Sequence, residues 1–382
     1  MIRLSKSVVG DQEAIALSKV VAHGYLGMGV EVQLFEQKLQ DYLDCSDRKV
    51  VCVNSGTAAL HLALQALGLG VGDEVLVPAM TYIASFQAVS ATGATPVACD
   101  VRLENGLLDL KDAQKRLSPK TKALMFVHYA SYCGDLQSVY DFAKQYKLRV
   151  VEDAAHAFGS IYQGKKIGSF GDVVCFSFDG IKNITCGEGG AIVSADSAVI
   201  NKVLDARLLG VHREKIEKLS SMQCSGDFDV MEQGFRYHMS NLMAAIGIVQ
   251  LNRFEKEFKP ARRQLISYYY ERLKNIPGIQ LLQMDLDDIV PHIMPMRVLN
   301  GQRDRLGIYL KQHAVEVGVH YKAAHLLSKY GHGRPRLPAA EQLAVELLTL
   351  PLHPELSKLD IDYIVDLVQI LLCEKSCVMS EN

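Results

Sequence analysis

The chain has 382 residues, of which 49% are apolar, and its formal net charge at pH 7 is −2. This length predicts one large and one smaller domain, each able to bury a core. Because charges of both signs are mixed and no block of lysine and arginine stands out, nucleic acid and anionic membranes are not expected as partners. The nine cysteines are scattered without a C-x-x-C pair, so neither a metal site nor a disulfide framework is predicted. Without a signal-peptide core or an apolar run of ~18 residues, the chain is expected to be cytoplasmic.

The first two thirds of the chain alternate between short apolar, β-branched segments and helix-forming segments. Strands are predicted at 49–53, 74–77, 95–99, 123–128, 148–152, 173–178 and 191–194, and helices at 58–67, 82–92 and 136–146. Strands that alternate with helices predict a mostly parallel sheet covered on both faces, hence an α/β fold. We assign residues 1–250 to this large domain.

From about residue 251 the pattern changes to longer helices with few strands, which predicts a smaller α+β domain over residues 251–382. Its helices are expected at 253–275, 303–313, 339–348 and 360–373, and its strands at 294–299 and 317–321.

A lysine and an acid stand where two of the predicted strands end. Lys182 lies between the strand at 173–178 and the glycine-rich residues 187–190, and Asp153 follows the strand at 148–152. Pyridoxal phosphate (PLP) chemistry needs this pair: the lysine forms the Schiff base, and the acid keeps the pyridine nitrogen protonated so that the ring accepts electrons.

A third feature is Ser55-Gly56-Thr57, which joins a predicted strand to the start of a helix. Backbone N–H groups and the helix dipole favour a phosphate at such a point. Ser and Thr are also good helix caps, so capping alone is the alternative. Neither G-x-x-x-x-G-K nor G-x-G-x-x-G occurs at this strand-to-helix turn, which disfavours a nucleotide loop of either kind there.

Each residue has an ordinary structural explanation when taken alone: Asp153 as a cap, Lys182 as a solvated loop residue, His156 as a satisfied polar group and Tyr82 as packing at a helix start. Their order is more specific. In open α/β sheets ligands bind beyond the carboxyl ends of the strands. A phosphate turn, a flat side chain, an acid and a lysine follow one another at such ends.

The sequence resembles the DegT/DnrJ/EryC1/StrS family of sugar aminotransferases, which have the aspartate aminotransferase architecture (PLP fold type I). The resemblance extends over nearly the whole chain. It is carried by the segments NSGTAAL (54–60), GDEV (72–75), GATPV (93–97), EDAAH (152–156), FSF (176–178), KN (182–183), GEGG (187–190), MS (239–240) and GVHY (318–321).

The resemblance implies a role for each matching position. Lys182 would be the catalytic residue that holds PLP. The other cofactor contacts would be Asp153 at the ring nitrogen, Tyr82 against the ring, His156 near the ring hydroxyl, and Gly56, Thr57 and Ser177 at the phosphate. A residue from the neighbouring subunit would also reach the phosphate. Arg236 holds that position, in a segment (GFRYHM, 234–239) where His238 replaces the usual arginine.

The same resemblance implies the reaction and the substrate contacts. The substrate would be a nucleotide-linked ketosugar, commonly a 4-keto-6-deoxy sugar, with glutamate as amino donor, in aminosugar biosynthesis such as that of lipopolysaccharide or O-antigen. Sugar contacts are expected from Tyr25, His320, Tyr321 and His325, with capping of a turn as the alternative for His325. The enzyme is expected to be a homodimer with shared active sites. A PLP-dependent sugar dehydratase and a non-catalytic regulator remain as alternatives, although dehydratases of this family carry histidine in place of Lys182.

Overall fold

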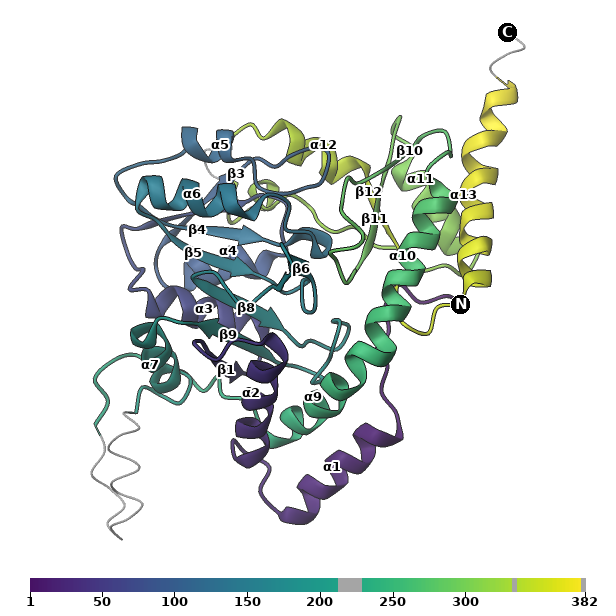
Figure 1. Cartoon of the computed structure of the whole chain (residues 1–382). Coiled ribbons are helices and arrows are strands. Elements are labelled where there is room, and N and C mark those ends of the chain that lie inside the picture. The colour runs from purple at the N-terminus through teal and green to yellow at the C-terminus, as the bar shows by residue number, and fades with distance from the viewer. Residues whose placement is uncertain (212–228, 332–334, 379–382) are drawn as a thin grey trace.

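The computed structural model describes residues 1–211, 229–331 and 335–378 (Figure 1). Its N-terminal two thirds contain the helices and strands α1 (Asp11–His23), α2 (Val30–Leu43), β1 (Lys49–Val53), α3 (Gly56–Ala66), β2 (Glu74–Pro78), α4 (Ile83–Ala91), β3 (Thr95–Cys99), α5 (Leu110–Lys115), β4 (Thr121–Val127), α6 (Leu136–Tyr146), β5 (Arg149–Asp153), β6 (Ile161–Tyr162), β7 (Lys165–Lys166), β8 (Val173–Ser177), β9 (Gly190–Ser194) and α7 (Ser197–Ala206). The remaining elements are α9 (Asn241–Arg253), α10 (Lys259–Leu273), β10 (Ile279–Leu281), β11 (Met294–Val298), α11 (Arg303–Gln312), α12 (Pro338–Glu346), β12 (Leu347–Leu350) and α13 (Lys358–Val378).

Seven strands form the large sheet in the order β1-β9-β8-β5-β4-β2-β3. Strands β3, β2, β4, β5 and β8 pair in parallel, and β9 runs antiparallel to both β8 and β1. All residues of β8 and β9 are buried, as expected for strands covered on both faces. The predicted α/β fold with a mostly parallel sheet is confirmed. Because β5 and β8 are parallel neighbours, the residues that follow Asp153 and Ser177 leave the sheet at the same edge.

A second, three-stranded antiparallel sheet has the order β10-β11-β12 and packs with α10, α11 and α13 around its own core. The predicted strand at 317–321 is wrong, because Gly318 makes only an isolated bridge to Thr349 there. The predicted helix at 339–348 ends at Glu346, and its last residues begin the buried strand β12. An apolar run that continues directly from a helix into a strand has no sequence signal for the change.

A nearly continuous helix connects the two sheets. Helix α9, a π-helical turn (Phe254–Phe258) and α10 follow one another without a break, and cross the domain boundary predicted after residue 250 (Figure 1). The hydrophobic core around the large sheet also contains residues that follow residue 250, among them Leu282, Ile293 and Leu343. The division into domains 1–250 and 251–382 stays a prediction.

The N-terminal residues pack against the second sheet rather than the first. Ile2 bridges to Val315, and the carbonyl of Leu4 accepts a hydrogen bond from Leu352 N–H at 3.0 Å. Within the described ranges, none of the helices has the length and apolar character that would let it cross a bilayer.

Candidate active site

A cavity of about 400 Å³ lies beyond the carboxyl ends of β5 and β8, beside the start of α3. Nine of the predicted site residues line it: Gly56, Thr57, Tyr82, Asp153, His156, Ser177, Lys182, His320 and Tyr321. These residues come from both halves of the chain, so folding brings positions as distant as 56 and 321 to one place.

One wall of the cavity is the N-terminus of α3. Ser55 caps the helix, and its hydroxyl accepts a hydrogen bond from Ala58 N–H at 3.1 Å. The next residue must be glycine, because a Cβ on Gly56 would lie 2.7 Å from the Cβ of Ser177. This close approach brings the first turn of α3 and the Ser177 hydroxyl together at the cavity. Helix N–H groups, the helix dipole and hydroxyls suit a phosphate.

Asp153 is held at the end of β5 by two hydrogen bonds. Ser85 Oγ donates to its Oδ2 at 2.7 Å, and the N–H of Ala155 donates to its Oδ1 at 3.2 Å. The Ser85 hydroxyl is itself 2.7 Å from the Thr81 hydroxyl. The carboxylate, 6% exposed, is therefore fixed in a buried position on the cavity wall, as a partner of a cationic ring nitrogen has to be.

Lys182 lies in the turn between β8 and β9, and its Nζ is 3.4 Å from His292 Nε2. Burial lowers the pKa of Lys182, against the opposite effect of Asp153 and Asp179. A lowered pKa increases the fraction of neutral amine at a given pH, and the neutral amine is the nucleophile and the base.

Three histidines surround this lysine. The His156 and His292 ring centroids are 4.6 Å apart, and burial, followed by the charge of Lys182, lowers both pKa values well below the usual histidine range. The same two causes lower the pKa of His320 to about 4. All three imidazoles are therefore neutral at pH 7, and can donate or accept a hydrogen bond without adding charge.

Two tyrosines also line the cavity. The Tyr321 hydroxyl is 2.9 Å from His156 Nε2, and the Tyr321 ring centroid is 5.8 Å from that of Tyr82. Tyr82 is the residue before the first turn of α4, makes no side-chain hydrogen bond to that helix, and is 59% exposed. An aromatic face that is open at a cavity can cover a flat ligand.

The sequence profile of the DegT/DnrJ/EryC1/StrS aminotransferase family matches residues 8–369. The chain belongs to this family. It is a PLP-dependent sugar aminotransferase.

Solved structures of related proteins agree with this assignment. The aminotransferase TlmJ from Streptoalloteichus hindustanus is 30% identical, with a TM-score of 0.90 over 98% of this chain and 100% of that one. DesV from S. venezuelae, solved in complex with a ketimine intermediate, is 32% identical, with a TM-score of 0.85 over 94% of each chain. Spr1654 from Streptococcus pneumoniae, solved in its PMP form, is 27% identical, with a TM-score of 0.91 over 98% of this chain and 100% of that one.

The cavity of this aminotransferase fits PLP. The N-terminus of α3 with Ser177 offers the phosphate cradle, which a Cβ at Gly56 would fill. Asp153 offers a buried carboxylate, and Lys182 offers an amine on the same cavity. The role of each residue stays a prediction.

Replacing Gly56 by alanine tests the phosphate cradle. The added methyl group would overlap Ser177 Cβ, so the start of α3 has to move away. We expect PLP affinity to fall about 5- to 160-fold, since an overpacked site costs about 1–3 kcal/mol. Equilibrium dialysis with PLP measures this. Gly70→Ala is the control, because a Cβ there meets only the Thr92 carbonyl at 3.8 Å. Unchanged PLP affinity in Gly56→Ala would contradict the cradle.

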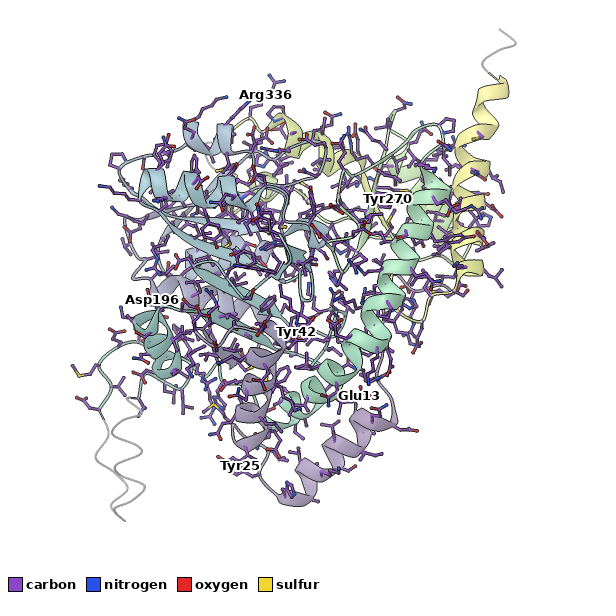
Figure 2. All side chains as sticks on the ribbon, viewed as in Figure 1. Glu13, Tyr25, Tyr42, Asp196, Tyr270 and Arg336 are labelled. Carbon is purple, nitrogen blue, oxygen red and sulfur yellow. The ribbon has the colours of Figure 1, made fainter. Side chains whose placement is uncertain are left out.

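Three predicted site residues do not line the cavity of this chain. Arg236 is exposed, in a segment that bridges to Leu208. Tyr25, 62% exposed, lies in the turn between α1 and α2 (Figure 2). His325 is buried, with its Nε2 3.4 Å from Glu341 Oε1. The predicted roles of Arg236 in a neighbouring subunit's site and of Tyr25 and His325 at the sugar stay predictions.

Sequence reasoning missed two residues of the site. His292 precedes a predicted strand and belongs to no recognisable pattern, yet its Nε2 lies 3.4 Å from the Lys182 amine. Ser85, which holds Asp153, lies inside a helix whose periodicity gives no reason to single it out. Only their contacts with predicted residues identify them.

Proposed function

We propose that this sugar aminotransferase converts a nucleotide-linked ketosugar, in particular a 4-keto-6-deoxy sugar, to the aminosugar with glutamate as amino donor, in two alternating half-reactions. The observation that supports it is the convergence of the Lys182 amine, the Asp153 carboxylate and the N-terminus of α3 on one cavity. When bound there, PLP supplies the electron sink for the α-carbanion of the donor.

The chain's own residues move the protons. Lys182 Nζ, whose pKa is lowered by burial, takes the α-proton of glutamate in the first half-reaction. In the second half-reaction it delivers a proton to the sugar carbon that receives the amine. Asp153 carries the negative charge that stabilises a protonated ring nitrogen, and Ser85 holds this carboxylate in place.

The part of the cavity that His320 and Tyr321 line suits a sugar. His320 is neutral at pH 7, and its Nδ1 is 2.9 Å from the Thr349 hydroxyl. Its neighbour Tyr321 adds a hydroxyl and a flat face on the same cavity. Such groups form directional hydrogen bonds with sugar hydroxyls.

We further propose that two copies of the chain form the active unit. Arg236 would reach the neighbouring cavity with a cationic group that binds phosphate. Tyr25 and His325 would contribute to the sugar site. The enzyme would act in the cytoplasm, in the formation of aminosugars such as those of lipopolysaccharide or O-antigen.

The reaction can be tested directly. The PLP-loaded enzyme is mixed with glutamate, and its visible absorption is followed before a panel of nucleotide-linked ketosugars is added. We expect glutamate to bleach the cofactor band, one ketosugar to restore it, and mass spectrometry to detect the corresponding aminosugar. Bleaching by glutamate without amination of any nucleotide-linked ketosugar would refute the proposed substrate class.

Tyr321→Phe and His320→Ala test whether these two residues contact the sugar. Each removes a neutral hydrogen bond worth about 0.5–1.5 kcal/mol, so the KM for the ketosugar should rise about 2- to 12-fold. The rate of bleaching by glutamate should stay nearly constant. If both variants slow the glutamate half-reaction and leave the sugar KM unchanged, these residues contact the cofactor and the sugar site lies elsewhere.

A further inference from the structure

One contact in the site has no role so far, that between Lys182 and His292. Their Nζ and Nε2 atoms are 3.4 Å apart, and His292 is only 4% exposed. His292 comes from the segment before β11, so it approaches the lysine from the second half of the chain. Neither the capping of an element nor a turn explains a histidine at this position.

The backbone of His292 is held on both sides. Its N–H donates to Ser131 Oγ at 3.0 Å. Its carbonyl accepts from Nη1 of Arg262, at 3.3 Å, and the same guanidinium nitrogen donates to the carbonyls of Pro291 and Leu352. Because Nη1 of this buried arginine donates to three backbone carbonyls, the arginine fixes the segment that carries the His292 ring.

The ring itself has one nitrogen facing Lys182 and one facing away. Nδ1 is buried and has no hydrogen-bond partner among the described residues. Retaining a buried polar atom without a partner costs stability, and such an atom in a native structure calls for an explanation. A function of the other ring nitrogen, Nε2, explains why a histidine occupies this position.

Charged and titratable groups around the pair favour a neutral ring. Burial is the main cause that lowers the pKa of His292, and the groups that face it, Lys182, His156, Arg262 and His320, lower it further. Lys182 itself faces the carboxylates of Asp153 and Asp179 and the guanidinium of Arg262. A neutral imidazole with its proton on Nδ1 leaves Nε2 as an acceptor directed at the amine.

We propose that His292 is a positioning residue for Lys182: its Nε2 accepts a hydrogen bond from the lysine amine whenever that amine is free, and thereby holds the nitrogen in place for proton transfer. The proposal rests on the role proposed above for Lys182. It also accounts for the hydrogen bonds by which Arg262 and Ser131 hold the backbone of His292.

The contact can be measured in the cofactor-free protein. Competitive labelling with acetic anhydride at a series of pH values, followed by peptide mapping, gives the pH at which Lys182 is half reactive. An ammonium donor binds an acceptor more strongly than an amine does, so removing the acceptor destabilises the charged form. In His292→Phe we therefore expect this pH to fall by about one unit, which corresponds to the loss of a hydrogen bond to a charged group.

Matched variants separate positioning from packing. His292→Gln, whose amide reaches as far as Nε2, should restore the labelling pH, whereas the shorter His292→Asn should behave like His292→Phe and replaces it if the Phe variant does not fold. His353→Phe changes another buried histidine, outside the lining of the cavity, and should leave the labelling pH unchanged. An unshifted labelling pH in both the Phe and Asn variants would overturn the proposal.

Kinetics of the PLP-loaded enzyme give a second measurement. His292→Phe or His292→Asn should lower kcat about tenfold or more with the KM for glutamate changed less than about threefold. The isotope effect with α-deuterated glutamate should increase, because proton transfer becomes slower. An unchanged kcat and isotope effect would count against positioning. Failure of the proposed function would appear elsewhere, as labelling of a different lysine by PLP or as no reaction with any ketosugar.

Discussion

Replacing Lys182 by alanine is expected to lower the rate of both half-reactions by at least about 10³-fold, because the variant loses the covalent attachment of the cofactor and the proton-transferring amine together. PLP should still bind through the N-terminus of α3, which the substitution leaves intact. Stopped-flow absorbance with glutamate measures the first half-reaction.

Borohydride reduction of the wild-type enzyme, followed by peptide mapping, identifies the attached lysine independently of rate. We expect PLP on the peptide containing Lys182. Lys202→Ala, on the exposed surface of α7, serves as the control and should retain full activity. Reduction that labels any other lysine, or a Lys182→Ala variant that turns over at a rate close to wild type, would refute the assignment.

The second large effect is expected from Asp153→Asn. The amide oxygen can still accept the Ser85 hydrogen bond that holds the wild-type carboxylate at 2.7 Å, so the fold should persist. The negative charge is lost, and a protonated ring nitrogen is no longer stabilised. Removing one such preorganised electrostatic contact lowers kcat by about 10²–10³-fold.

Steady-state kinetics, with circular dichroism to confirm folding, measure the effect. Asp135→Asn is a matched control, because Asp135 caps α6 outside the cavity and asparagine caps a helix equally well. A kcat for Asp153→Asn within a few-fold of wild type would show that Asp153 is not the partner of the ring nitrogen.

Local patterns were sufficient for most of the large sheet. The apolar segments 49–53 and 95–99 are strands with the bounds expected from the sequence, and 136–146 is a helix with the expected bounds. Patterns failed where one apolar run serves two elements, as at Leu347–Leu350, and where the chain is held by distant contacts, as in 317–321. Periodicity describes which face of an element is buried. Leu347–Leu350 is buried at every position, so it has no free face to reveal, and 317–321 forms only an isolated bridge.

The candidate site divides in the same way. Gly56, Asp153, Ser177 and Lys182 stand at strand ends or turns, and the parallel order of β5 and β8 is enough to bring the last three to one edge of the sheet. Sequence patterns could not identify His292 as a site residue, because its position depends on how the second half of the chain packs against the first.

The sequence by itself determined the class of this protein: the alternating segments specify a parallel sheet, and the ordered blocks from residue 54 to residue 321 specify the sugar aminotransferase family. Only the tertiary structure decided which side chains meet. Hydrogen bonds such as Ser85 to Asp153 and contacts such as His292 to Lys182 join residues 68 and 110 positions apart. The reason is physical: secondary structure follows from neighbours within a few residues, whereas the pKa of Lys182 and the orientation of Asp153 depend on burial and on partners that only the packed chain supplies.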